Sequence, residues 1–306
     1  MIISASYRTD IPAFYSQWFF NRLRAGWCRV RNPYSGKPAR VDLRPESVTG
    51  FVFWTRNFAP VLARAAELHA CGRPYVVQFT ITGYPRTLET AVIPPAAAVD
   101  QIRRLSVEVH PLCPVWRYDP IVFSSETTPD FHRRNFASLA AALEGASTEV
   151  VVSFAQIYAK SRRNLDAAAA RHGLQWHDPD DSVKIALADE LAQTAASRGM
   201  KLTICTQPRY LSPASAEARC VDARRLSAIA GLPLAVPLKG NRPGCACHES
   251  RDIGEYDTCP HGCAYCYAVR NRPLALRRYK AHDPDGDSLL PLPPEPSPAS
   301  DLFLFK

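Results

Sequence analysis

Short apolar segments alternate with longer segments of helical character along most of this sequence. Six segments have the composition of buried strands, at residues 2–6, 51–55, 75–82, 115–122, 149–158 and 201–205. Segments typical of helices lie between them, at 12–26, 58–71, 94–109, 129–144 and 179–198. Strands that alternate with helices form βαβ units and hence parallel sheets. We therefore predict an α/β fold, in which a (β/α) barrel of parallel strands, complete or partial, is the natural closure.

A doubly wound open sheet is the alternative, but no G-x-G-x-x-G follows the first strand. In both architectures, chemistry takes place at the carboxyl ends of the strands. Polar segments follow all six predicted strands: SYRTD, WTRN, FTITGY, WRYDP, SFAQIY and CTQ. Their convergence on one edge predicts a polar, partly basic pocket.

The chain divides into three parts by composition. Residues 1–205 are the predicted barrel body, and 206–280 are a cysteine-rich extension that we expect to pack on it. Residues 281–306 form a proline-rich tail, with six of the 27 prolines between Pro284 and Pro298. Such a composition predicts a flexible, disordered tail.

The charge and the cysteine content limit the class of protein. The net charge of +8 favours an anionic partner such as nucleic acid or a phosphorylated metabolite, although arginines scattered over a solvated surface would give the same value. No apolar run of 18 residues is present, so no membrane association is expected. The first residues lack the pattern of an export signal, which predicts a cytoplasmic location with reduced thiols. Ten cysteines then indicate metal ligands or catalysis rather than disulfides.

Three of the cysteines are closely spaced near residue 260. Cys259, Cys263 and Cys266 follow a C-x₃-C-x₂-C pattern, and the intervening Pro260 and Gly262 exclude a helix. Three thiolates on one loop can hold three irons of a cubane cluster and leave the fourth iron open to a substrate or cofactor. A structural zinc site is the alternative, with His261 or a distant cysteine as its fourth ligand.

Four further cysteines form a second candidate metal site. Cys205, Cys220, Cys245 and Cys247 could hold an auxiliary [4Fe–4S] cluster or a structural zinc ion. The alternative is that Cys205 and Cys220 are buried small hydrophobic residues. The remaining cysteines, at 28, 71 and 113, are expected to be structural.

The segment CPHGCAYC, with an aromatic residue before its last cysteine, resembles the cluster loop of the radical S-adenosylmethionine superfamily. This resemblance implies a [4Fe–4S] cluster on Cys259, Cys263 and Cys266, with S-adenosylmethionine chelated to the open iron and Tyr265 near its adenine. It also implies an electron donor such as a flavodoxin or ferredoxin.

A wider set of segments is similar to an uncharacterised family, domain of unknown function 1848. These segments are ISASYRTDIPAFY, VFWTRN, QFTITGYP, WRYDPI and ESRDIGEYDTCPHGCAYCYA, and the similarity spans roughly residues 1–270. The family has no assigned reaction. WTRN and WRYDP also resemble strand ends in the spore photoproduct lyase-like branch of the superfamily.

The cysteine motif follows the predicted barrel, whereas in ordinary members of the superfamily it follows the first strand. A circular permutation would explain this order and would place the motif beside residues 2–6. SYRTD would then replace the second strand end, which makes Ser4, Ser6, Arg8 and Asp10 candidates for binding the cofactor's methionine amino group.

Other polar residues near the strand ends have two interpretations each. Thr80 and Thr82 are candidate cofactor contacts or simply strand-favouring residues. Arg117 and Asp119 could contact ribose hydroxyls or form a buried ion pair with each other. Just before the cysteines, Arg251 and Asp252 are expected to hold the loop through hydrogen bonds.

The leading hypothesis is a radical S-adenosylmethionine enzyme that acts on an unknown substrate, for which nucleic acid or a nucleotide is the first expectation. The competing hypothesis is a non-catalytic nucleic-acid-binding module stapled by zinc or iron–sulfur clusters. Hydrolase motifs such as the P-loop, G-x-S-x-G and H-E-x-x-H do not occur.

Overall fold

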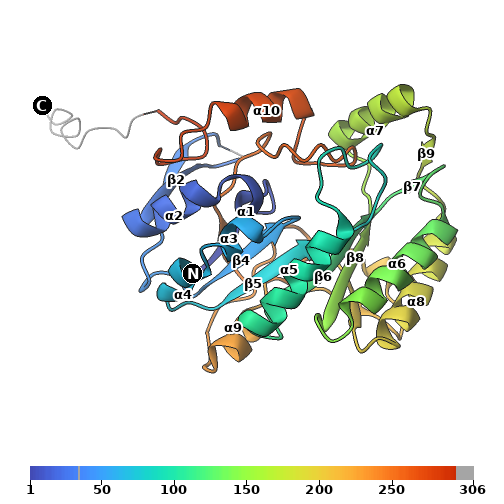
Figure 1. Ribbon diagram of the computed structural model, residues 1–306, viewed down its shortest axis with the longest axis horizontal. Helices are drawn as coiled ribbons and strands as arrows, with labels where there is room; N and C mark the ends of the chain where they lie inside the picture. Colours follow the sequence, from blue (N-terminus) through green and yellow to red (C-terminus); the bar gives the residue numbers. More distant parts are fainter. Residues whose placement is uncertain (34, 294–306) are drawn as a thin grey trace, which may run out of the picture.

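One parallel sheet organises the molecule. The computed structural model describes residues 1–33 and 35–293. Eight strands pair in the order β11–β10–β8–β6–β5–β4–β1–β12, and every neighbouring pair is parallel. Their bounds are β1 Ile2–Ala5, β4 Gly50–Thr55, β5 Tyr75–Thr80, β6 Pro114–Ile121, β8 Glu149–Phe154, β10 Lys201–Ile204, β11 Ala216–Glu217 and β12 Ser250–Asp252. The predicted α/β fold is therefore correct, and the sheet is open, as in a partial barrel, because β11 and β12 are its two edges. Figure 1 shows its central strands β4, β5, β6 and β8 side by side.

The six predicted strands and most of the predicted helices form. The helices of the body are α1 Ile11–Phe14, α2 Ser16–Ala25, α3 Ala59–Leu62, α4 Ala65–Ala70, α5 Pro95–Glu108, α6 Pro129–Leu143, α7 Ala159–His172 and α8 Asp181–Ala196. The later helices are α9 Ala223–Ala230 and α10 Arg272–Lys280, and a 3-10 turn covers Pro208–Tyr210. Two antiparallel pairs lie outside the main sheet, β2 Trp27–Arg31 with β3 Pro38–Asp42 and β7 Phe123–Ser124 with β9 Trp176–His177. None of the helices described is long and apolar enough to cross a bilayer.

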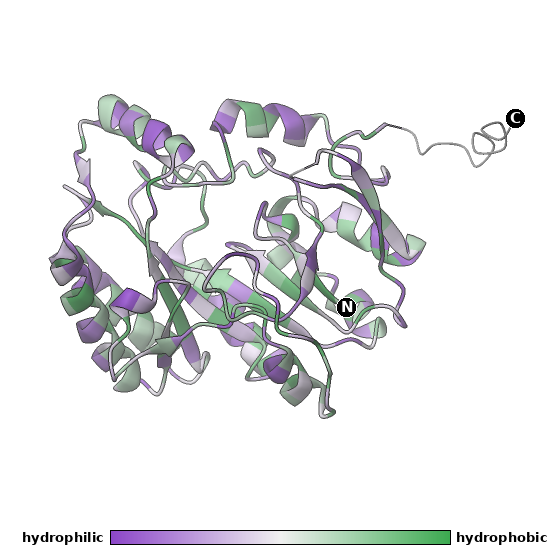
Figure 2. Cartoon of the chain, turned by 180° about the vertical axis from the view of Figure 1, so that it is seen from behind, coloured by the Kyte–Doolittle hydropathy of each residue, from purple (hydrophilic) through white to green (hydrophobic). Residues whose placement is uncertain are grey.

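The two faces of the sheet bury different cores because side chains alternate along each strand. One face carries residues such as Ile3, Phe53 and Val77, which pack with the larger core under α2, α5, α6 and α8. The other face carries Ile2 and Val52, which pack with a smaller core under α9 and the irregular chain around it. Figure 2 shows the apolar strands at the centre and helices with mixed polar and apolar faces around them.

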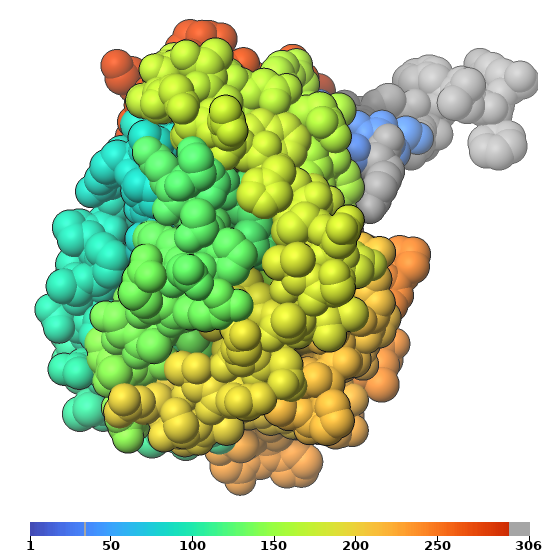
Figure 3. Space-filling view, turned by 90° about the vertical axis from the view of Figure 1, so that its right-hand side faces the viewer, coloured from blue at the N-terminus to red at the C-terminus, as the bar shows by residue number. Residues whose placement is uncertain are grey.

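Helix α6 illustrates how local sequence sets an element. Thr128 accepts a hydrogen bond from the backbone N–H of Phe131, and Pro129 occupies the first turn, where its missing N–H costs nothing. The buried side of α6, including Phe136, then packs on the sheet, with α8 beside it. In the side view of Figure 3, these helices form a continuous surface below α7.

The segment 206–280 contributes both edge strands of the sheet. Strand β11 pairs with β10, and β12 pairs with β1 in the register Ile2↔Ser250 and Ser4↔Asp252. The chain after β12 therefore leaves the sheet at its carboxyl edge, beside the turn that follows β1. This placement carries the cysteine motif to the edge where the polar strand ends converge.

The start of the predicted flexible tail is ordered, which corrects that expectation for residues 282–289. Trp18 donates its indole N–H to the Gly286 carbonyl at 3.0 Å, and Arg29 forms an ion pair with Asp287 at 3.2 Å. Leu289 is 3% exposed and belongs to the larger core. Proline and charge content predicted disorder here, but one apolar side chain and several backbone acceptors suffice to dock the segment on α2 and β2. The rest of the predicted tail, from residue 294, lies outside the described residues.

Candidate functional site

The cysteine loop, residues 253–271, joins the carboxyl end of β12 to α10. Its three thiols, Cys259, Cys263 and Cys266, are free and lie on the carboxyl side of the sheet. Gly262 adopts a positive φ of 75°, and a Cβ there would approach the side chain of Arg272 to 2.4 Å, so this position requires glycine. The Arg272 side chain in turn donates to the Pro260 carbonyl at 3.0 Å. The turn between the first two cysteines is thus fixed by α10.

Burial controls the protonation of these thiols when no metal is bound. It raises the pKa of Cys263 to about 12 and raises the pKa values of Cys259 and Cys266 as well. The neighbouring Arg56 guanidinium opposes the shift at Cys263. A buried thiol with a raised pKa stays protonated by itself. It becomes a thiolate ligand when a bound metal cation offsets the negative charge of the sulfur.

A buried carboxylate, Asp252, fastens the root of the cysteine loop to β1. Asp252 is the last residue of β12 and is 6% exposed. Its oxygens accept hydrogen bonds from Ser4 Oγ at 2.9 Å, Ser6 Oγ at 2.8 Å and Arg8 Nε at 2.8 Å. Ser4, Ser6 and Arg8, which were predicted as cofactor contacts, therefore bind Asp252 at the start of the loop. Asp252 holds the loop through hydrogen bonds, as expected from its position just before the cysteines.

A second carboxylate, Asp10, fastens the middle of the loop. It accepts from His261 Nε2 at 2.8 Å, from Thr55 Oγ1 at 2.7 Å and from the backbone N–H of Arg56 at 2.8 Å. His261 is 3% exposed, and its other nitrogen lies 3.3 Å from the Ala91 carbonyl. Both nitrogens of this imidazole thus face protein acceptors, and the residue positions the turn between Cys259 and Cys263.

A charged cluster under Tyr265 holds the last part of the loop. Tyr265 donates its hydroxyl to Glu89 and accepts from Arg56 Nη2 at 2.5 Å, and Arg56 also pairs with Glu89 at 2.8 Å. Thr82 donates to the same carboxylate. The backbone at residues 88–91 pairs with the loop, where Ala264 N–H donates to the Leu88 carbonyl at 2.9 Å. These contacts fix the aromatic ring that precedes Cys266.

The polar residues on the strands form a buried network on the smaller-core face. Arg117 pairs with Asp119, donates to Gln78 Oε1 at 3.0 Å, and lies 5.0 Å from the Trp54 ring. The mutual Arg117–Asp119 pair was one of the two expectations for these residues. Thr80 lies opposite Arg117 in the register of β5 and β6. Trp54 donates to Ser4 Oγ at 3.0 Å, which connects this network to the root of the cysteine loop.

The four-cysteine group, Cys205, Cys220, Cys245 and Cys247, is brought together from three separate segments. The sulfurs of Cys205 and Cys220 are 3.6 Å apart. Cys247 Sγ accepts from the backbone N–H of Val221, the residue after Cys220, at 3.3 Å, and Cys245 lies two residues before Cys247. A hydrogen bond with Cys247 lowers the pKa of Cys245 to about 6, whereas the pKa of Cys205 is raised by its hydrogen bond with Cys220. All four thiols are free.

The three thiols of the cysteine loop fit an iron–sulfur cluster better than a single metal ion. Within residues 1–33 and 35–293, no three His, Cys, Asp or Glu side chains surround a single point as ligands of one metal ion. Cluster thiolates bind separate irons and need not converge in this way. Arg8 provides a hydrogen-bond donor for a bound ligand. Its Nη1 is buried at the same edge of the sheet and has no hydrogen-bond partner among the described residues. Three free thiols on one loop suit such a cluster, and a guanidinium N–H at the same edge of the sheet suits an anionic ligand.

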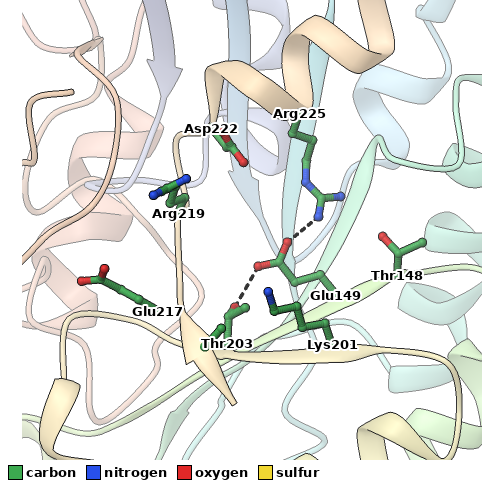
Figure 4. Close-up of a pocket in the computed structure, with 9 residues that line it drawn as sticks. Thr148, Glu149, Lys201, Thr203, Glu217, Arg219, Asp222 and Arg225 are labelled. Carbon is green, nitrogen blue, oxygen red and sulfur yellow. Dashed lines mark hydrogen bonds and ion pairs between the residues drawn. The ribbon is translucent and has the colours of Figure 1, made fainter. Parts of the chain in front are cut away.

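A hollow of about 450 Å³ lies elsewhere, at the amino ends of β8 and β10 (Figure 4). Glu149, Lys201, Arg219 and Arg225 line it, and the Glu149 carboxylate is already engaged by Arg225 and by Thr203 Oγ1. Both cysteine groups lie toward the opposite, carboxyl edge of the sheet, and no cysteine lines this hollow.

A family model described as "Domain of unknown function (DUF1848)" matches residues 2–268. The chain belongs to the DUF1848 family. Neither the curated proteins nor the solved structures contain a match. DUF1848 membership thus agrees with the similarity seen in the strand-end segments and the cysteine motif, and it assigns no reaction.

Two site residues had no role predicted from the sequence. Glu89 is 2% exposed and bonds to Tyr265, although it lies in TLET, a segment with no distinctive pattern. Gln78 lies within an apolar strand and donates to the Cys220 carbonyl at 2.9 Å. A polar residue inside an otherwise apolar strand was the available signal for Gln78, whereas nothing local distinguished Glu89.

Proposed function

We propose that this protein is a radical S-adenosylmethionine enzyme whose [4Fe–4S] cluster is held by Cys259, Cys263 and Cys266. The observation that carries the proposal is the position of these three free thiols on a loop at the carboxyl edge of a parallel sheet. When bound, such a cluster supplies one electron for reductive cleavage of S-adenosylmethionine, which yields a 5′-deoxyadenosyl radical.

The chain's own residues position the loop for this role. Asp252, Asp10 and Glu89 are buried carboxylates that grip the beginning, middle and end of the loop. Tyr265 is held by Arg56 and Glu89, in a position suited to line an adenine site. The remaining N–H of Arg8 is available for the carboxylate of the methionine part.

The strand order supports a circular permutation of the superfamily's partial barrel. When the sheet is followed from β12, the order is β12, β1, β4, β5, β6, β8, β10 and β11. Only β12 is out of chain order, and it is the strand that leads into the cysteine loop. Moving this strand and its loop to the beginning of the chain would give a sequential parallel sheet whose first loop carries the cysteines.

The surroundings of the loop favour an anionic substrate, with a nucleotide or nucleic acid as the proposed class. Helices α7 and α10 flank the loop (Figure 1), and Asn164 of α7 donates to the Val269 carbonyl at 3.1 Å. The exposed basic residues here are Arg162, Arg163, Arg270, Arg277 and Lys280. Exposed Tyr158 and Tyr267 offer aromatic faces for bases to stack on.

Anaerobic purification with iron and sulfide analysis tests the proposal. We expect an electron paramagnetic resonance signal of a reduced [4Fe–4S] cluster that changes when S-adenosylmethionine is added. The variants Cys259→Ala, Cys263→Ala and Cys266→Ala should each lose that response, whereas Cys71→Ala, outside both cysteine groups, should keep it. A wild-type protein with zinc only, and with no iron signal, would contradict the proposal.

The competing function, a metal-stapled nucleic-acid-binding module, predicts a different result. Such a module would bind oligonucleotides with a strong salt dependence and would not respond to S-adenosylmethionine. No particular contact of the described residues favours it over the enzyme, since the basic helices serve either function.

A further inference from the structure

We propose that the four-cysteine group, Cys205, Cys220, Cys245 and Cys247, is a second metal site that binds a thiophilic centre through four thiolates. The proposal goes beyond the radical chemistry proposed for the cysteine loop and does not depend on it. Four thiolates form a closed ligand set for a [4Fe–4S] cluster, in which each sulfur binds a separate iron. A single zinc ion fits less well, because no three such side chains of the described residues surround one point. Metal binding would release the thiol protons to solvent and leave each sulfur bonded to the metal centre.

The four thiols come from three separate segments of the chain. Cys205 follows the carboxyl end of β10, Cys220 follows β11, and Cys245 and Cys247 lie on the loop before β12. The sulfurs of Cys205 and Cys220 are 3.6 Å apart, and Cys247 Sγ accepts from the backbone N–H of Val221, the residue after Cys220, at 3.3 Å. All four cysteines pack in or against the smaller core. None of these four thiols forms a disulfide. A metal centre bound to all four would therefore cross-link the three segments.

Positive groups surround the sulfurs, as a negatively charged thiolate site requires. Arg117, which is 4% exposed, has its Nη1 at 3.1 Å from Cys220 Sγ. Arg242 places Nη2 at 3.6 Å from Cys205 Sγ, and the backbone N–H of Val221 lies 3.3 Å from Cys247 Sγ. Donors of this kind stabilise metal-bound thiolates and orient them.

The local fold also needs a cross-link. The chain from 232 to 249 contains a single isolated bridge, Leu238↔His248, and residues 239–244 are exposed. Gly240 packs so closely that a Cβ would lie 2.2 Å from the Cys245 carbonyl oxygen, which shows a tightly folded turn. A stretch with so little regular structure and apolar burial is of the type that structural metals stabilise.

The test uses the full-length protein in which Cys259, Cys263 and Cys266 are all replaced by alanine, purified without oxygen. We expect it to retain about four irons with sulfide per chain. Metal-depleted protein should recover this content with Fe²⁺ and sulfide, whereas retention of about one zinc from Zn²⁺ alone would contradict a cluster. Because the first cysteine set is absent, failure here is separate from failure of the proposed radical chemistry.

Adding Cys205→Ser and Cys247→Ser to this background should lower the bound metal at least tenfold, whereas adding Cys71→Ser should leave it unchanged. If the doubly substituted protein does not fold, Cys245→Ser alone provides the test, because Cys245 is only half-buried, and its metal should transfer to a chelator roughly tenfold faster. A folded three-alanine protein without metal, or one whose four thiols form disulfides instead, would overturn the proposal.

Discussion

At the scale of single residues, the Asp252 carboxylate is the group that joins the start of the cysteine loop to β1 and the turn after it. It accepts hydrogen bonds from two serines and a buried guanidinium, and from the backbone of Tyr7 and Gly254. Asp252→Asn keeps the size but removes the charge that Arg8 requires. Because an uncompensated buried charge remains, we expect a loss of about 3–5 kcal/mol in the free energy of unfolding, measured with chemical denaturant.

The matched control for Asp252→Asn is Glu46→Gln. Glu46 is an exposed partner of Arg44 at 3.5 Å, and such surface pairs contribute less than about 1 kcal/mol. Equal effects of the two substitutions would mean that Asp252 does not anchor the cysteine loop.

Gly254, two residues after Asp252, allows the loop to approach the turn after β1. A Cβ at this position would lie 2.0 Å from Ser6 Oγ. We therefore expect Gly254→Ala to destabilise the protein by about 1–3 kcal/mol in thermal or chemical unfolding. The double variant with Ser6→Gly should lose less stability than the sum of the two single changes, and strict additivity would contradict the predicted clash.

The superfamily resemblance placed the cysteine motif beside residues 2–6, but the individual hydrogen-bond partners could not be predicted from sequence. Ser4, Ser6, Arg8 and Asp10 were candidates because the expected permutation puts SYRTD next to the motif. Their hydrogen bonds go to Asp252 and His261, more than 240 residues away, and that pairing exists only because β12 lies beside β1. Local pattern carries no information on such a long-range neighbour.

At the scale of elements, α6 contains a histidine that should make stability depend on pH. His132 is fully buried, with Nδ1 near Tyr118 Oη at 2.9 Å and Nε2 near the Val122 carbonyl at 3.0 Å. Burial lowers the pKa of His132 from 6.5 to about 4. The unfolded chain therefore takes up a proton first as pH falls, so folding stability is lost between pH 6.5 and 4, by up to about 3 kcal/mol.

The measurement is the difference in pH dependence between variants. His132→Gln should show a smaller loss of stability on going from pH 7 to pH 4.5 than the wild type. His172→Gln, at an exposed position at the end of α7, should follow the wild-type curve. Parallel curves for wild type and His132→Gln would show that His132 does not titrate in this range.

The segment 282–289 behaves as an element although its composition predicted disorder. Leu289 is its buried side chain, at 3% exposure. We expect Leu289→Ala to destabilise the protein by about 2 kcal/mol, at the low end for a core leucine because the segment can detach locally. Leu238→Ala, at 63% exposure, should have little effect, and hydrogen exchange near Trp18 should rise only in the first variant.

Central elements were predictable and edge elements were not. Strands β4, β5 and β8 are apolar on both faces, which is the pattern of a buried parallel strand. Edge strand β12 is only the three residues SRD, and β11 only two, so neither has an apolar run to recognise. Helix α7 was missed because it buries little more than Ser161 and Leu165, which leaves a weak apolar stripe.

At the scale of the whole molecule, the parallel sheet brings both cysteine groups into one buried network. The series of contacts runs from Asp252 through Ser4 to Trp54, and from Trp54 through Arg117 to Cys220. The first two steps each cross to the neighbouring strand, and the contact of Trp54 with Arg117 spans β5, which lies between β4 and β6. The α/β fold with a parallel sheet was predicted from the alternation of strands and helices, in the form of a complete or partial barrel. The open edges of the sheet and this cross-sheet network required the strand order.

The formation of 5′-deoxyadenosine tests the central claim most directly. The anaerobic protein, reduced with dithionite and supplied with S-adenosylmethionine, should release 5′-deoxyadenosine and methionine even without its substrate. Cys263→Ala should reduce this product at least a hundredfold, whereas Cys71→Ala should match the wild type. An iron-loaded wild-type protein that forms no more 5′-deoxyadenosine than Cys263→Ala would contradict the account.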